Sequence, residues 1–141
     1  MKIAATLIGF TALCSALASG AASAGDLKVE VHGITETKGD VLVAVFNQKG
    51  LWLKQSLISK KIAASTNKVV VLFEGLPEGD YAVSAVHDLN SNGHLDRNPI
   101  GMPTEPYGFS NDATGNFGPP SFDSAKITLT QTAHNISVRV N

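Results

Sequence analysis

Cysteine is almost absent from this chain of 141 residues: the single cysteine is Cys14, and none lies between Gly25 and Asn141. The long C-terminal part therefore holds no disulfide, no thiolate nucleophile and no cysteine-ligated metal. Cys14 follows Leu13, whereas a lipid-attachment cysteine follows a small residue, so we do not expect lipid anchoring. The folded part must be stabilised by a hydrophobic core, with or without a bound ion.

A hydrophobic run long enough to span a membrane is also absent. The apolar stretch from Ile3 to Ala18 is interrupted by glycine, serine and threonine, and it is shorter than the roughly 20 residues that a spanning helix needs. Lys2 precedes the stretch and Ala22-Ser23-Ala24 follows it, which is the organisation of a secretory signal peptide. We therefore predict a removable signal at residues 1–24, one domain at residues 25–141, and a periplasmic or secreted location. A retained membrane anchor is the alternative.

The chain has no excess of positive charge. Without Lys2, ten basic and twelve acidic residues remain, which argues against a nucleic-acid partner. The charges are unevenly placed, with five lysines and no acid between Asn47 and Lys68, and five acids with only Arg97 between Asp88 and Asp123. A solvated surface is the usual meaning of a lysine-rich segment, and contact with anionic lipid head groups is the alternative.

Long amphipathic helix patterns are missing, and short strand patterns are present. Residues 27–31 and 81–87 alternate apolar and polar side chains, as half-buried strands do. Val41–Phe46 is continuously apolar and predicts a central strand buried on both faces. Residues 68–73, 126–130 and 135–140 add further strands, with Leu57-Ile58 as an additional candidate and Leu51-Trp52-Leu53 as a short cover. The pattern predicts an all-β fold, a single antiparallel β-sandwich of six to eight short strands.

One segment, Pro99–Phe122, has no regular pattern and is rich in glycine and proline. A loop of this length inside a compact domain is usually functional or held by its own packing. It carries Tyr107, Phe109, Phe117 and Phe122. We expect these aromatic rings to fill the core and pin the loop against the sandwich; a ligand-binding loop is the alternative.

The segment from Asp88 to Asp96 has the spacing of a calcium loop. Asp88, Asn90, Asn92 and Asp96 place side-chain oxygens at positions 1, 3, 5 and 9 of the segment. Gly93 stands at position 6, where the chain must turn, and His94 at position 7 would offer its backbone carbonyl. Alternate residues of a tight loop can aim oxygens at a hard cation such as Ca2+, so these five ligands form the predicted metal site.

The calcium loop is incomplete. Position 12, a bidentate glutamate in an EF-hand, is Pro99 here, so an ion would need help from Glu105, Asp112, Asp123 or water. The alternative is a turn whose Asn and Asp side chains bond their own backbone.

Catalytic signatures are weak. His32, His87, His94 and His134 lack metal-ligand spacing, and neither Ser110 nor Ser121 lies in a nucleophile elbow. His87, Asp88 and Asp96 are the residues that a hydrolase acting on an envelope polymer would use. Such an enzyme requires them to converge in a cleft.

Four segments carry a family resemblance: LPEGDYAV at 76–83, HDLNSNGHLD at 87–96, PTEPYGFSN at 103–111 and GPPSF at 118–122. They resemble the small secreted bacterial proteins catalogued as domain of unknown function 2141, and the likeness covers nearly all of residues 25–141. It implies a periplasmic or secreted β-sandwich and no established activity. The strand with Gly79-Asp80-Tyr81 that feeds an Asp/Asn loop is also similar to immunoglobulin-like, transthyretin-like and collagen-binding-B-type sandwiches.

Together these features predict an exported, non-catalytic binding or accessory module of the cell envelope with a structural calcium loop. An envelope polymer, a lipid head group or a protein could be its partner. The envelope hydrolase and a purely structural domain without ligand are the alternatives.

Overall fold

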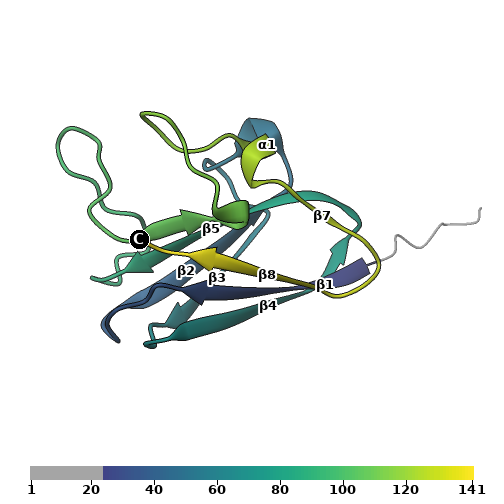
Figure 1. Ribbon diagram of the computed structural model, residues 1–141, viewed down its shortest axis with the longest axis horizontal. Helices are drawn as coiled ribbons and strands as arrows, with labels where there is room; N and C mark the ends of the chain where they lie inside the picture. Colours follow the sequence, from purple (N-terminus) through teal and green to yellow (C-terminus); the bar gives the residue numbers. More distant parts are fainter. Residues whose placement is uncertain (1–23) are drawn as a thin grey trace, which may run out of the picture.

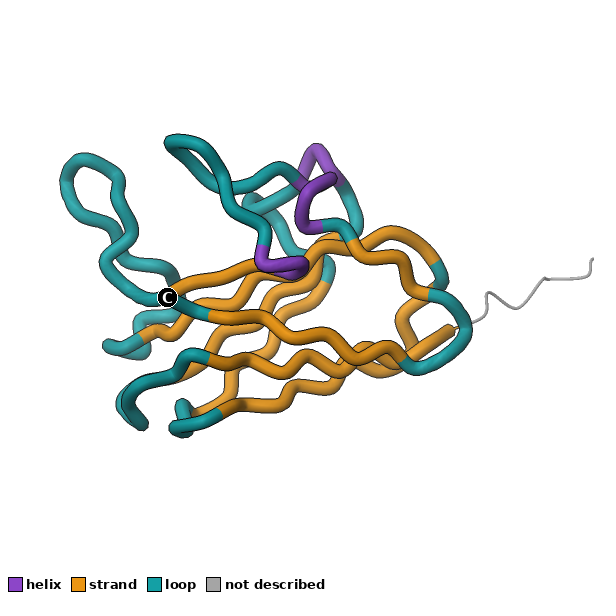
Figure 2. Tube along the Cα trace, in the orientation of Figure 1, coloured by secondary structure: helices purple, strands orange, loops and turns teal. Residues whose placement is uncertain are grey.

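Strands dominate the computed structural model, which describes residues 24–141 (Figures 1 and 2). The elements are β1 (Ala24–His32), β2 (Asp40–Phe46), η1 (Lys49–Leu51), β3 (Ile58–Ala63), β4 (Lys68–Pro77), β5 (Gly79–Asp88), β6 (Tyr107–Phe109), η2 (Ser110–Asp112), α1 (Phe122–Ala125), β7 (Ile127–Leu129) and β8 (His134–Arg139). Cys14 and the predicted signal peptide, except for Ala24, lie outside the described residues. Within residues 24–141, no helix has the length and apolar character needed to cross a bilayer.

The strands form two sheets, which confirms the predicted all-β sandwich. One sheet has the order β4-β1-β8 and the other has the order β3-β2-β5-β6. In the second sheet, β7 also pairs with β5, at residues 79–81. Strand accounts for 47% of the structure, above the two-fifths that we expected for such a fold. The pairing is antiparallel except between β1 and β8, which run parallel.

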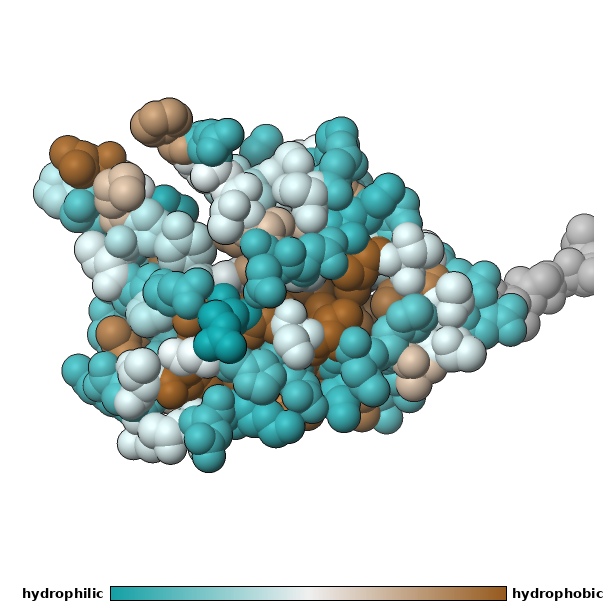
Figure 3. All heavy atoms as spheres, in the orientation of Figure 1, coloured by the Kyte–Doolittle hydropathy of each residue, from teal (hydrophilic) through white to brown (hydrophobic). Residues whose placement is uncertain are grey.

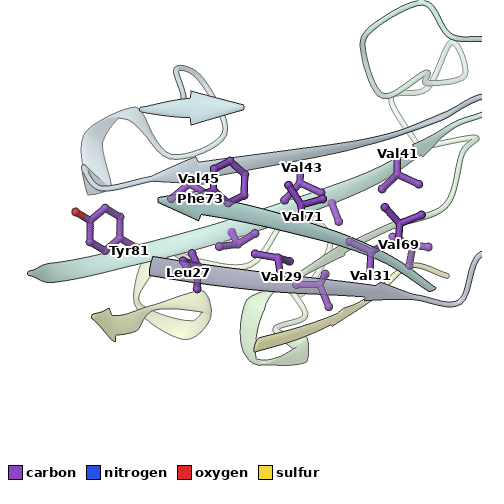
Figure 4. Packing of buried hydrophobic residues seen from close by; sticks show 14 of the residues in the cluster. Leu27, Val29, Val31, Val41, Val43, Val45, Val69, Val71, Phe73 and Tyr81 are labelled. Carbon is purple, nitrogen blue, oxygen red and sulfur yellow. The ribbon is translucent and has the colours of Figure 1, made fainter. Parts of the chain in front are cut away.

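The main core lies between the sheets, because alternate residues of each strand point inward. From β1, β2 and β4 the inward residues are Leu27, Val29, Val31, Val41, Val43, Val45, Val69, Val71 and Phe73, and Figure 4 shows them interleaved. The prediction that Val41–Phe46 is buried on both faces was wrong, since Leu42 and Ala44 are only half-buried. They point to the outer face of the five-stranded sheet, which is covered only in part.

A second apolar cluster covers part of that outer face. It consists of Phe46, Ala82, Phe109, Phe122 and Ala125, with Ala44, Trp52, Tyr107 and Ala113 packed against it. The Trp52 ring lies 4.9 Å from the Phe46 ring between centroids, and its Nε1 donates to the Pro120 carbonyl at 2.8 Å. The segments around η1 and α1 therefore form a cover over the sheet, as the sequence predicted for Trp52. Phe109 and Phe122 are buried as predicted, but in this outer cluster and not in the main core between the sheets.

The last two residues connect the two sheets along one side. Val140 N–H donates to the His32 carbonyl at 2.9 Å, and Asn141 exchanges two backbone hydrogen bonds with Tyr107 in β6. A Cβ at Gly108 would overlap the Arg139 carbonyl, so glycine permits this close approach. Residues 140–141 thus hold β6 of one sheet against β8 of the other.

Candidate functional site

The predicted calcium loop begins where β5 ends, at Asp88. The Asp88 carboxylate is fully buried, and its two oxygens accept the backbone N–H groups of Asn92 (3.1 Å) and Gly93 (2.7 Å). Ser91 and Gly93 have positive φ angles of 57° and 89°, which let the chain reverse within a few residues. The loop is therefore wrapped around the Asp88 carboxylate.

The other predicted ligands meet on the exposed side of this loop. The side-chain amides of Asn90 and Asn92 donate to the two oxygens of Asp96, at 2.6 and 2.7 Å. The amide oxygens of Asn90 and Asn92 accept the backbone N–H groups of Asn92 and His94 at 3.2 and 3.1 Å. Asn90, Asn92 and Asp96 thus form one bonded cluster, whereas the His94 side chain is exposed.

Glu105 braces the loop from a distant part of the chain. Its nearly buried carboxylate accepts Leu89 N–H at 2.9 Å and Asp96 N–H at 3.0 Å, so it holds both ends of the loop. Thr104 N–H adds a bond to the Asp96 carbonyl at 2.9 Å. The sequence suggested Glu105 only as a possible extra ion ligand and gave no sign of this bracing role, because its partners are backbone groups.

The remaining acids considered as ligands lie elsewhere. Asp123 pairs with Lys49, and Asp112 lines a separate groove. Between residues 24 and 141, no three histidine or acidic side chains are grouped so that they could hold a metal. An ion in this loop would therefore depend on the carboxylates of Asp88 and Asp96 together with amide, backbone and water oxygens. Each Asp88 oxygen keeps a second lone pair beyond its N–H bond, so the existing bonds do not block such a role.

His87 does not join these acids. Consecutive residues of a strand point to opposite faces, and His87 points into the core while Asp88 points to the outer face. The His87 ring is fully buried, and its Nε2 lies 2.9 Å from the Lys38 carbonyl, to which it can only donate. No described group bonds its Nδ1. The imidazole is thus shielded from any substrate at the loop.

A groove of about 500 Å³ is lined on one side by residues of segment 113–120. Tyr107, Phe109 and Pro120 form apolar parts of its wall, and Asp112, Arg139 and Asn141 supply polar groups. The sequence prediction missed this site, because Arg139 and Asn141 come from the far end of the chain. The only available signal was the length of the irregular segment 99–122.

The long segment 99–122 is more regular than predicted, since it contains β6 and η2. Ser110 is fully buried at its centre and bonds to Val83 N–H and the Ala125 carbonyl. Phe109 and Phe122 are buried and Tyr107 is half-buried. The prediction for Phe117 was wrong: its side chain is fully exposed at the tip of the loop.

The lysine-rich segment is largely paired. Lys49 pairs with Asp123, Lys61 with Asp40 at 3.7 Å and Lys68 with Glu30 at 3.3 Å, and Lys60 donates to the Leu72 carbonyl at 2.6 Å. Its positive charge is therefore partly neutralised within the molecule.

Comparison with known proteins identifies a family and no closer relative. No curated protein and no solved structure matches the chain. Residues 29–137 match the family model described as an uncharacterized protein conserved in bacteria, domain of unknown function 2141. Since this match covers most of the chain, including both sheets and the 88–96 loop, the protein belongs to that family.

Proposed function

We propose that this protein is an exported, non-catalytic binding or accessory module of the cell envelope, in which the 88–96 loop holds a structural Ca2+. Export to the periplasm or the medium rests on the signal-like sequence of residues 1–24. The observation that carries the metal proposal is the convergence of Asn90, Asn92 and Asp96 on one side of a loop wrapped around Asp88.

Calcium would relieve an electrostatic cost in this loop. Asp88 and Asp96 belong to one short turn, and a divalent cation between oxygen ligands offsets the repulsion of two carboxylates. With two carboxylates and no glutamate at position 12, we expect a dissociation constant of roughly 0.1–1 mM, as in extracellular modules. Such an ion would fix the entry to segment 97–122, which carries the groove.

The envelope-hydrolase alternative has less support. It requires His87, Asp88 and Asp96 to meet at a substrate, but His87 is buried on the opposite face and Asp88 is enclosed by backbone N–H groups. A purely structural domain without ligand remains the alternative that a metal titration must separate from our proposal.

Calcium titration with thermal melting tests the proposal. At ten times its dissociation constant, Ca2+ would add about 1.4 kcal/mol, a melting shift of roughly 3–8 °C for a domain of this size. Magnesium should do less, because it demands a smaller octahedral cage. Asp96→Asn should remove the calcium-dependent shift, because it removes one of the two carboxylate ligands. The fold should remain intact, because the Asp96 side chain bonds only the amides of Asn90 and Asn92 in the described structure.

Asp112→Asn is the matched control, since it removes one exposed acid outside the loop and should keep the full shift. If about 10 mM Ca2+ moves the melting point of the parent no more than that of Asp96→Asn, the loop is an Asx-rich turn and the metal role is wrong.

A further inference from the structure

Two loops extend from the same side of the sandwich in Figures 1 and 2, namely residues 97–104 and residues 113–120. Their ends carry three large apolar side chains, which we call the apolar tips: Ile100 (82% exposed), Met102 (58%) and Phe117 (111%). Among the described large apolar residues, these three are the most exposed. Figure 3 shows brown and tan side chains at the ends of both protrusions.

The first tip is held in place by its own hydrogen bonds. The Asn98 side chain accepts the N–H groups of Ile100 (3.1 Å) and Met102 (3.0 Å), and the Arg97 guanidinium donates to the Gly101 carbonyl at 2.9 Å. Asn98 N–H also bonds the Met102 carbonyl at 2.9 Å. Ile100 and Met102 are therefore presented to solvent by a braced turn.

The second tip carries backbone strain. Phe117 has a φ of 57°, a left-handed conformation that is unfavourable for a bulky side chain. Strain of this kind clusters at sites where the conformation has a use. Here it accompanies the full exposure of a phenylalanine ring, which costs free energy in water.

Charge is missing from both tips. Neither residues 98–104 nor residues 113–122 contain an ionisable side chain. The first tip is bordered by the cation Arg97 and by Glu105, whose side chain is buried. An apolar surface without acids can enter the interface of a bilayer without burying a charge.

The area and shape of the tips favour a bilayer over a protein partner. Three side chains bury on the order of 500 Å² at most, whereas each partner in a specific protein interface buries roughly 600–1,000 Å². The tips are separate convex protrusions, so a protein partner would need two matching pockets. A lipid interface accepts separate protruding side chains to a depth of roughly 5–10 Å.

We propose that Ile100, Met102 and Phe117 insert together into the interfacial region of a lipid bilayer and anchor this protein reversibly to a membrane surface. The bases of the loops are acidic, because Asp88, Asp96, Glu105, Asp112 and Asp123 outnumber the cations Lys49, Arg97 and Arg139. Binding is therefore driven by apolar burial, and it favours zwitterionic over anionic lipid when no divalent cation is present. The inference does not depend on the calcium loop.

Vesicle flotation tests the anchor. Residues 24–141 contain both apolar clusters and both sheets, so this segment is used without the apolar leader, which would itself bind lipid. Phosphatidylcholine vesicles in EDTA should carry the parent to the top of a gradient. Phe117→Ser should lower the partition coefficient by about tenfold, and adding Ile100→Ser and Met102→Ser should abolish flotation.

Val70→Ser is the matched control, because Val70 is an exposed apolar residue on the outer face of β4, away from the tips. It should float like the parent. Phe117→Trp supplies a direct readout: its emission should shift to the blue with vesicles, beyond any change that Trp52 gives in the parent.

Three results would overturn the proposal. The parent could remain in the aqueous phase at millimolar phosphatidylcholine, or the triple variant could float as well as the parent. Alternatively, binding could occur only on anionic phosphatidylglycerol vesicles and vanish by about 0.15 M salt, which would assign it to screened surface lysines.

Discussion

The carboxylates of Asp88 and Glu105 differ from the other acids of this region, because each accepts two backbone N–H groups. We predict that Glu105→Gln lowers the free energy of unfolding by about 1.5–3 kcal/mol. A glutamine has only one oxygen, so its NH2 group would face one of the two part-buried backbone N–H donors. Urea denaturation measures this change, with or without Ca2+.

Asp112→Asn is the control for Glu105→Gln, because it removes the same charge from an exposed side chain. The backbone of Asp112 has a positive φ of 47°. Asparagine tolerates that conformation, so this variant should unfold like the parent. Equal denaturation midpoints for Glu105→Gln and the parent would contradict the bracing role.

Two carboxyl groups, those of half-buried Glu30 and exposed Asp80, make stability depend on acid pH. The hydrogen bond from Lys68 lowers the pKa of Glu30 below 4.5, and the hydrogen bond from Thr128, with Lys126 nearby, lowers the pKa of Asp80 below 3.8. Because the folded pKa is depressed, the stabilisation is present above the unfolded pKa and is lost as pH falls through the folded pKa.

We therefore predict that the urea midpoint falls as pH drops below about 4.5, and that the Glu30→Gln, Asp80→Asn double variant shows a shallower fall. Asp80 is exposed and Glu30 is only half-buried, so water screens both groups. The effect is therefore small and should shrink further in 0.5 M salt. A steeper acid dependence in the double variant would contradict the assignment.

At the scale of elements, the sequence predicted the strands well because burial follows a period of two. β1 and β5 alternate as expected, and the loop after β5 has the tight turn that its Asp, Asn and Gly spacing indicated. The sequence could not predict which aromatic residues of segment 99–122 are buried and which are exposed. Phe117 and Phe122 are the same residue type five positions apart, and only the path of the chain decides which one reaches Trp52.

The cover over the five-stranded sheet depends on Phe122 and not on Phe117. Phe122 is buried with its ring 5.9 Å from Trp52, whereas Phe117 is fully exposed. Phe122→Ala should cost on the order of 3 kcal/mol, and Phe117→Ala should leave the melting temperature within about 1 °C of the parent. The two substitutions are chemically identical, so equal melting temperatures would show that the cover is misassigned.

At the scale of the whole molecule, composition and periodicity could predict a two-sheet β fold but not its pairing. The parallel neighbours β1 and β8 come from opposite ends of the described chain, and their side-chain patterns would fit either direction. The same holds for the groove, which needs Arg139 beside residues 113–120. Such long-range neighbours are set by the connection from β7 across to the other sheet, which local residue patterns do not encode.

Val140 and Asn141 close one side of the sandwich. Val140 is buried in the main core, and Val140 and Asn141 together make three backbone hydrogen bonds to His32 and Tyr107. Deleting residues 140–141 should cost about 3–5 kcal/mol, from one buried valine and three backbone bonds. That is a large part of the 5–15 kcal/mol typical of a domain and lowers the melting temperature by more than about 10 °C.

Both sheets should weaken together in the deletion variant, because the lost bonds join one sheet to the other. Trp52 fluorescence follows the outer cover and far-ultraviolet circular dichroism follows all strands, and we expect the two melting curves to coincide. Asn141→Ala keeps the backbone bonds and an exposed side-chain position, so it should melt like the parent. A deletion variant that melts within about 2 °C of Asn141→Ala would mean that the two sheets are held together by the main core alone.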